Sequence, residues 1–220
     1  MTEKLALSVT ETAALLGNPE DKAYFARLKA TEKQALNAAY FDASTGSYCG
    51  GVQGADAFAL ALGLGDDRTK ENLIRKYSAL GAFDTGIFGT DLLIKTLFEL
   101  GEGALAFRLL TNKTKNSFYN MMQGGTNTLW ENWDGCDSLC HPMFGAVNEY
   151  LFSHILGIRR YEDRPGFRDI VIRPAAIPGL TAKGSYSTPD GMIEVSVSTD
   201  QHGKQTVSYT VQGDITVHAQ

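Results

Sequence analysis

The stretch QGADAFALALGLGDDRTKENLIRKYSAL, residues 53–80, decides the fold class because it joins two helical patterns of opposite character. Residues 53–64 are rich in Ala and Leu with hardly a charge, and an all-round apolar helix is normally buried. Asp66 and Asp67 can cap the start of the following helix, residues 68–80, which is amphipathic and more exposed. The stretch therefore predicts a buried inner helix followed by a more polar outer one.

The same alternation extends to both sides of this stretch. Residues 20–40 carry apolar side chains at roughly helical intervals, and residues 41–46 have turn composition. Residues 90–100 form another apolar helix that Gly101 closes in a C-cap position. Further helices are predicted at residues 104–110, 117–122 and 143–156. Buried inner helices that alternate with polar outer ones suggest a toroid of helix pairs rather than a four-helix bundle.

After Gly157 the helical period disappears and prolines become frequent. Strands are predicted at residues 169–173, 193–198 and 206–211, with turns at 189–191 and 200–204. The predicted fold class is mainly α with a C-terminal β module. We expect a helical toroid over residues 1–160 and a small antiparallel β-sandwich over residues 161–220.

Composition and charge exclude several classes of partner. The chain has 220 residues and a net charge of −5, so it lacks the basic footprint of a protein that binds nucleic acid. No apolar run is long enough to cross a bilayer, and the first residues lack the apolar core of a signal peptide. We expect a cytoplasmic protein with no membrane partner and no cofactor. Its acidic net charge fits a neutral ligand such as a sugar better than a polyanion.

The three cysteines raise the question of a metal site. Cys136 and Cys140 are four residues apart, and His141 follows them. Zinc would need further Cys or His ligands at suitable spacing, and the other histidines form no such pattern. The odd number of cysteines, with Cys49 as the third, also argues against a disulfide framework. Reduced thiols and no metal are therefore expected.

The segment GGTNTLWENWDG, residues 124–135, holds the strongest candidates for chemistry. Trp130 and Trp133 flank Glu131, and indole faces can stack on a sugar ring while polar neighbours bind its hydroxyls. A carboxylate among aromatic side chains can be tuned as an acid, a base or a nucleophile. The alternative is a helix cap with core aromatics, and composition alone favours neither.

Two further polar segments have both a functional and a structural interpretation. FDTGIFGT, residues 83–90, contains Asp84 but could equally be a helix entry with glycines for close packing. SLCHP, residues 138–142, contains His141, which could simply bond a backbone carbonyl at the start of the next helix.

Taken together and in this order, these segments resemble the bacterial α-L-rhamnosidase family of glycoside hydrolases. The resemblance covers roughly residues 40–200. The segments that match are residues 53–64, 85–90, 125–134, 138–147, and 156–158 leading into 165–167.

The resemblance implies a partial (α/α)6 barrel followed by a small β-sandwich, and a rhamnose-containing oligosaccharide or glycoside as the partner. Such enzymes cleave terminal α-L-rhamnose with inversion, using one carboxylic acid and one carboxylate that activates water. Glu131 stands where the family motif places the general base. Trp130 and Trp133 would line the rhamnose subsite, and His141 and Asp84 would bind substrate.

The chain also departs from the family pattern. Cys140 replaces the asparagine that usually precedes the histidine, and Ser117-Phe118-Tyr119 stands where a tryptophan is common. Nothing resembles the family's general-acid segment, and seven or eight helices are too few for twelve. Asp84, Asp134 or Asp137 could substitute as the acid, although their spacing favours none of them.

These departures leave three interpretations open. The chain could be a rhamnosidase or the C-terminal part of one, a non-catalytic sugar-binding or structural fragment, or a hydrolase of another terminal sugar. An open toroid would expose apolar inner helices, and exposed patches of that size mark interfaces. We therefore expect a homo-oligomer or a missing N-terminal half that covers them.

Overall fold

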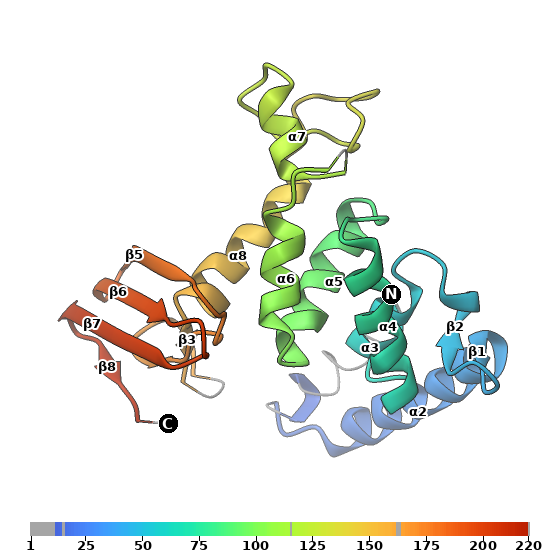
Figure 1. The fold of residues 1–220 in the computed structure, drawn as a ribbon. Helices are drawn as coiled ribbons and strands as arrows, with labels where there is room; N and C mark the ends of the chain where they lie inside the picture. Colours follow the sequence, from blue (N-terminus) through green and yellow to red (C-terminus); the bar gives the residue numbers. More distant parts are fainter. Residues whose placement is uncertain (1–11, 15, 115, 162–163, 220) are drawn as a thin grey trace. The chain divides into compact units, whose positions relative to one another are not determined.

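The computed structural model describes residues 12–14, 16–114, 116–161 and 164–219. The chain divides into two compact units, Met1–Lys76 and Tyr77–Gln220, and each is described by itself. Helices dominate up to residue 155 and strands from residue 158 onward, which confirms the predicted class (Figure 1). The predicted domain division at residue 160 stays a prediction.

The first unit begins with a long helix that matches its predicted range. Helix α2 spans Pro19–Tyr40, and the Asn18 side chain caps it by accepting a hydrogen bond from the Asp21 amide. Proline suits the first helical position because it has no amide hydrogen to leave unpaired. The predicted turn at residues 41–46 closes a short hairpin of strands β1 (Phe41–Asp42) and β2 (Ser47–Tyr48).

The predicted buried helix at residues 53–64 is shorter and less enclosed than expected. After a 3₁₀ turn, η1 (Cys49–Gly51), helix α3 covers only Ala55–Ala61, and Phe58 is 40% exposed while Ala57 is fully buried. Gly63 has φ +70°, a conformation that ends a helix. The expectation of burial on every face was therefore wrong for this helix within the described residues.

Helix α4 (Asp67–Leu80) begins with the cap that the sequence predicted, although Asp66 alone forms it. The Asp66 carboxylate accepts from the Thr69 amide (3.1 Å), and the Thr69 hydroxyl accepts from the Asp66 amide (3.2 Å). This reciprocal pair satisfies amides that the helix start would otherwise leave unpaired. The hydrogen bonds, chiefly that from Thr69, lower the pKa of Asp66.

The second unit contains the apolar helix α5 (Ile87–Glu99) and the short helix α6 (Gly103–Leu110), which lie side by side (Figure 1). Leu93, Ile94 and Leu97 of α5 are completely buried. Gly101 follows α5 with φ +81°, as its predicted C-cap position requires. Helix α7 (Phe118–Gln123) is capped by the Ser117 hydroxyl. In the part of the chain that the structure describes, no helix has the length and hydropathy that a membrane span needs.

The predicted helix at residues 143–156 is helical throughout but changes its pitch twice. It comprises a 3₁₀ segment η2 (Pro142–Val147), α8 (Asn148–Tyr150) and a π turn η3 (Leu151–Ile155). Its buried side chains include Phe144, Val147 and Tyr150, three residues apart, and then Ile155. A 3₁₀ helix has three residues per turn and a π turn is wider, so these pitches keep the apolar side chains on one face.

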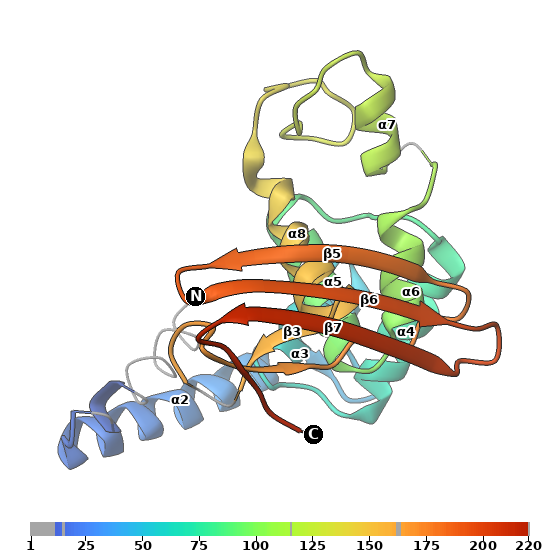
Figure 2. The same cartoon turned by 90° about the vertical axis from the view of Figure 1, so that its left-hand side faces the viewer.

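Two small sheets form the β module. One contains β3 (Ile158–Arg160), β4 (Asp169–Ile172) and β8 (Thr216–Val217); the other contains β5 (Thr181–Thr188), β6 (Gly191–Thr199) and β7 (Gln205–Gly213). Figure 2 shows β5, β6 and β7 side by side. Apolar residues of both sheets share one core, including Ile170 from β4 and Val195 from β6, so a small sandwich is present. The β4–β8 pairing is parallel, which residue alternation did not predict.

Gly157 lies between the last helical turn and the first strand of the β module, where the backbone at Pro174 packs closely against it. It has φ +78°, and an added Cβ would lie 2.1 Å from the backbone nitrogen of Pro174. Gly101 has a similar φ of +81° but nothing within 4 Å of its virtual Cβ. We expect Gly101→Ala to lower the free energy of unfolding by about 1 kcal/mol through backbone strain alone.

Gly157→Ala adds a backbone clash to that strain, so we expect a loss of roughly 2–4 kcal/mol. Urea denaturation of both variants measures the difference. Equal losses in the two variants would show that the backbone at Pro174 can move aside.

Candidate functional site

The loop between α7 and η2, residues 124–141, doubles back on itself. The Glu131 amide donates to the Ser138 carbonyl (2.8 Å), and the His141 amide donates to the Leu129 carbonyl (2.7 Å). The Thr128 hydroxyl donates to the carbonyl of Leu139. These backbone pairs bring the segment of Glu131 beside the segment of His141, and both residues are predicted to belong to one site.

Trp133 joins this loop to the polar segment of residues 83–90. Its indole nitrogen donates to the Thr85 carbonyl (2.7 Å), and the ring stacks on Phe83 with centroids 5.2 Å apart. Phe118 and Phe144 complete the surrounding aromatic cluster, and Trp133 is only 8% exposed. Trp133 therefore fastens the loop to the helical core.

Trp130 is held within the loop itself. Its indole nitrogen donates to the Thr126 hydroxyl (2.7 Å), and the residue is 7% exposed. A Cβ on Gly124 would lie 2.1 Å from the Trp130 ring, so glycine is required for the indole to fit. Both tryptophans thus pack as core aromatics here, and their contact with a sugar ring stays a prediction.

Glu131 is half-buried, whereas Asp134 and Asp137 beyond it are exposed. The Asp134 carboxylate accepts from the Cys136 amide (3.2 Å), and Asp137 accepts from the Asn132 side chain. The hydrogen bond to Asp134, followed by desolvation and Asp137, raises the pKa of the Cys136 thiol to about 11. Cys136 is therefore a protonated thiol near neutral pH rather than a nucleophile.

His141 has an unsatisfied ring nitrogen. Its Nε2 atom is buried, and no partner for it exists among the residues that the structure describes. A buried polar atom without a partner costs free energy, so native proteins rarely keep one unless another group completes it. Within the described ranges, this nitrogen therefore does not form the hydrogen bond to a backbone carbonyl that was the structural alternative for His141.

Asp84 is half-buried and accepts a hydrogen bond from the Tyr77 hydroxyl (2.5 Å). Its neighbour Thr85 receives the indole hydrogen bond of Trp133, and the Thr85 and Thr90 hydroxyls are 2.8 Å apart. The hydrogen bond between Trp133 and Thr85 thus connects the Asp84 segment to the loop of Glu131. A direct contact of Asp84 with substrate stays a prediction.

Cys49, Cys136 and Cys140 are all free and exposed. Across the described residues, no group of three or more His, Cys, Asp or Glu side chains could hold a metal ion.

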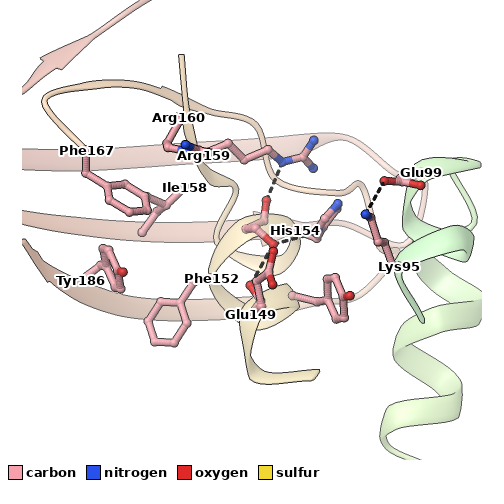
Figure 3. A pocket seen from close by; sticks show the side chains of 12 residues that line it. Lys95, Glu99, Glu149, Phe152, His154, Ile158, Arg159, Arg160, Phe167 and Tyr186 are labelled. Atoms are coloured by element: carbon pink, nitrogen blue, oxygen red, sulfur yellow. Dashed lines mark hydrogen bonds and ion pairs between the residues drawn. The ribbon is translucent and has the colours of Figure 1, made fainter. Parts of the chain in front are cut away.

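A cavity of about 630 Å³ lies where α5 and the η3 turn approach the β module (Figure 3). No local motif predicted this cavity, because its lining combines two side chains of α5, several between residues 149 and 160, and the distant Phe167 and Tyr186. His154 in this lining is half-buried, and its ring stacks on Phe98 with centroids 4.6 Å apart. Desolvation, and then the charges of Arg159 and Lys95, lower the pKa of His154 to about 4.

This shift predicts a loss of stability in mild acid. The pKa of His154 is lower in the folded chain than its ordinary value near 6.5, so the unfolded chain binds the proton first. The contribution of neutral His154 is complete above pH 6.5 and is lost as the pH falls toward 4. Because the ring is only half-buried, we expect about 1–2 kcal/mol.

Urea midpoints at pH 7 and pH 4.5 measure this loss. His154→Gln should make the midpoint less dependent on pH, whereas His202→Gln, at an exposed turn position, should not. The same pH dependence in all three proteins would assign the loss to carboxylates instead.

The chain is similar in sequence to known α-L-rhamnosidases. Residues 3–155 match the model of the bacterial alpha-L-rhamnosidase 6 hairpin glycosidase domain. An alpha-L-rhamnosidase of Formosa agariphila is 31% identical over 203 residues, which are 84% of this chain and 22% of that protein. An alpha-L-rhamnosidase of Alteromonas is 30% identical over 93% of this chain and 24% of its own length.

Solved structures agree with these sequence matches. The Streptomyces avermitilis alpha-L-rhamnosidase complexed with L-rhamnose superposes with a TM-score of 0.82 at 25% identity, over 98% of this chain and 22% of that one. The enzyme from Dictyoglumus thermophilum gives a TM-score of 0.78 at 26% identity, over 90% of this chain and 24% of its own. The chain spans about a quarter or less of the length of each of these relatives.

Proposed function

The chain belongs to the family of the bacterial α-L-rhamnosidase six-hairpin glycosidase domain, and on that premise we propose that its loop 124–141 forms part of an inverting active site with Glu131 as the general base. The substrate would be a glycoside or oligosaccharide with terminal α-L-rhamnose. Members of this family are glycoside hydrolases, so the proposed reaction is attack of water on a glycosidic bond with general acid and base catalysis.

The unsatisfied Nε2 of His141 carries the proposal most directly. The nitrogen is buried and unpartnered among the described residues, and backbone pairing sets its segment beside that of Glu131. A sugar hydroxyl would satisfy the nitrogen by donating to it or accepting from it. Binding of rhamnose would therefore recover a hydrogen bond that the free chain lacks.

In the proposed reaction the Glu131 carboxylate takes a proton from water while the water oxygen attacks the anomeric carbon. The glycosidic bond breaks, and the departing oxygen takes a proton from a general acid. Asp134 and Asp137 are exposed and hydrogen-bonded to the loop, and we assign the acid to neither. An aryl leaving group needs little protonation, so an aryl rhamnoside can be hydrolysed without a general acid.

The stereochemistry of the first product tests the mechanism. We expect the chain to hydrolyse 4-nitrophenyl α-L-rhamnoside slowly and to release β-L-rhamnose first, as proton NMR of the anomeric signals can follow. Release of the α anomer first would show retention and exclude the assignment of Glu131 as a base acting on water.

The alternative is a sugar-binding chain without turnover. The buried Nε2 atom of His141 favours it, because a hydrogen bond to a sugar needs no general acid and none is assigned in the loop. In that case L-rhamnose should still shift the NMR signals of the His141 ring, although no aryl rhamnoside would be cleaved. A folded chain with neither response would exclude both functions.

A further inference from the structure

The cavity beside the η3 turn has one charged side and one aromatic side (Figure 3). Its volume of about 630 Å³ is in the range of cavities that bind small molecules. It lies at the end of the 142–155 helical segment that faces the β module, whereas the loop of Glu131 lies at the other end (Figure 1). It is therefore separate from the proposed rhamnose site.

Arg159 of β3 is the distinctive group on the charged side. Its Nε atom donates to the Ser153 carbonyl (2.6 Å), which fixes the plane of the guanidinium. Its two terminal nitrogens form no hydrogen bond or ion pair within the described parts of the chain. Burial, and then the charge of Arg173, lower the pKa of Arg159, so the cation is incompletely compensated. A fixed guanidinium with free terminal nitrogens suits the two oxygens of a carboxylate.

The other charges of the lining set limits on the anion. Lys95 and Glu99 lie 3.8 Å apart as an ion pair and largely neutralise each other. Arg160 adds a positive charge and Glu149 a negative one. With these charges offset in pairs, a single carboxylate would balance Arg159, whereas a doubly charged phosphate would leave one negative charge without a partner.

His154 supplies a hydrogen-bond acceptor rather than a charge. The Ser153 hydroxyl donates to the Glu149 carbonyl (2.8 Å), so it accepts from His154 Nδ1 at 2.8 Å. The proton of the neutral imidazole therefore lies on Nδ1, and Nε2 is left as an acceptor. Together with the Glu149 carboxylate, this nitrogen can receive hydrogen bonds from hydroxyl groups.

The aromatic side consists of Phe152, Phe167 and Tyr186. The Tyr186 ring lies 5.4 Å from that of Phe152 and 4.9 Å from that of Phe167, and none of the three is fully buried. Aromatic faces of this kind pack on the C–H faces of sugar rings, and hydroxyls then reach polar groups across the cavity. A ligand with a ring, hydroxyls and one carboxylate combines all these features.

We propose that this cavity binds a uronic acid unit of a glycan, with its carboxylate on Arg159, its hydroxyls on His154 and Glu149, and its ring on Phe152 and Tyr186. That the ligand is a sugar rests on the proposed function, whereas recognition of a carboxylate by Arg159 rests on the cavity alone. The site would hold an acidic glycan at a distance from the bond that the loop of Glu131 cleaves.

Calorimetric titration of the full chain with digalacturonate tests this assignment, with its methyl ester as a neutral probe of nearly the same shape. We expect the acid to bind at least about tenfold more tightly than the ester, because the ester loses the charge-assisted bonds. Arg159→Gln should weaken binding of the acid by a similar factor. Arg108→Gln, at an exposed position on α6, should leave it unchanged.

Additional variants separate binding from folding and from hydrolysis. Phe152→Ala, at a residue 36% exposed, should weaken both probes without unfolding the chain, as circular dichroism would show. Glu131→Gln should bind digalacturonate like the unsubstituted chain, so a failure of hydrolysis does not bear on this site. Equal binding of acid and ester, competition by acetate as strong as by the sugar acid, or full binding by a folded Arg159→Gln chain would each overturn the proposal.

Discussion

Replacement of Glu131 by glutamine is expected to lower the turnover of 4-nitrophenyl α-L-rhamnoside by about 10²–10⁴-fold, the range that a positioned acid or base contributes. Glutamine has nearly the same size and keeps a carbonyl oxygen, but it cannot accept the proton of the attacking water. Because the aryl leaving group needs little protonation, the base step should dominate the measured rate. The loss should therefore appear in kcat, while KM changes little.

A matched control excludes a general effect of removing one negative charge. Glu71→Gln, at an exposed position of α4, makes the same chemical change and should leave kcat and KM as they are. L-Rhamnose should still shift the His141 ring signals in Glu131→Gln, because the proposed binding contact remains. Turnover within a factor of two of the unsubstituted chain would remove Glu131 from the role of base.

Replacement of Trp133 by alanine is expected to lower the free energy of unfolding by about 3–5 kcal/mol, as deletion of a large buried aromatic side chain does. Trp133 is 8% exposed and packs among Phe83 and Phe144. Its indole also satisfies the Thr85 carbonyl, which would lose this donor. A loss of this size is a large part of the stability of an ordinary domain.

Two further variants separate the contribution of the Trp133 hydrogen bond from that of its apolar packing. Trp133→Phe keeps most of the apolar volume but loses the bond to Thr85, so we expect an intermediate loss of about 1–3 kcal/mol. Phe88→Ala, at a residue 65% exposed on the neighbouring helix, should change stability by less than about 0.5 kcal/mol. Urea unfolding monitored by far-ultraviolet circular dichroism measures all three. An unchanged midpoint in Trp133→Ala would show that the packing of Trp133 contributes nothing to the stability of the fold.

Much of the secondary structure was predictable because its signals lie within a few residues of one another. Gly101 ends α5 and Asp66 caps α4, and both positions follow from local backbone chemistry. Strand β5 was missed because its sequence TAKGSYST is small and polar, and only its pairing with β6 makes it a strand. The pitch changes between residues 142 and 155 were missed for the same reason, since tertiary burial selects them.

The sequence by itself determined the helical class, the β module, the family resemblance and the candidate Glu131, since each depends on residue types at short spacing. Only the tertiary structure decided that Trp133 is enclosed by Phe83 and Phe144 and that the Nε2 of His141 has no partner among the described residues. Burial and hydrogen-bond satisfaction depend on which distant segments meet. Arg159 and Tyr186 show this most clearly, because they line one cavity although no local pattern relates them.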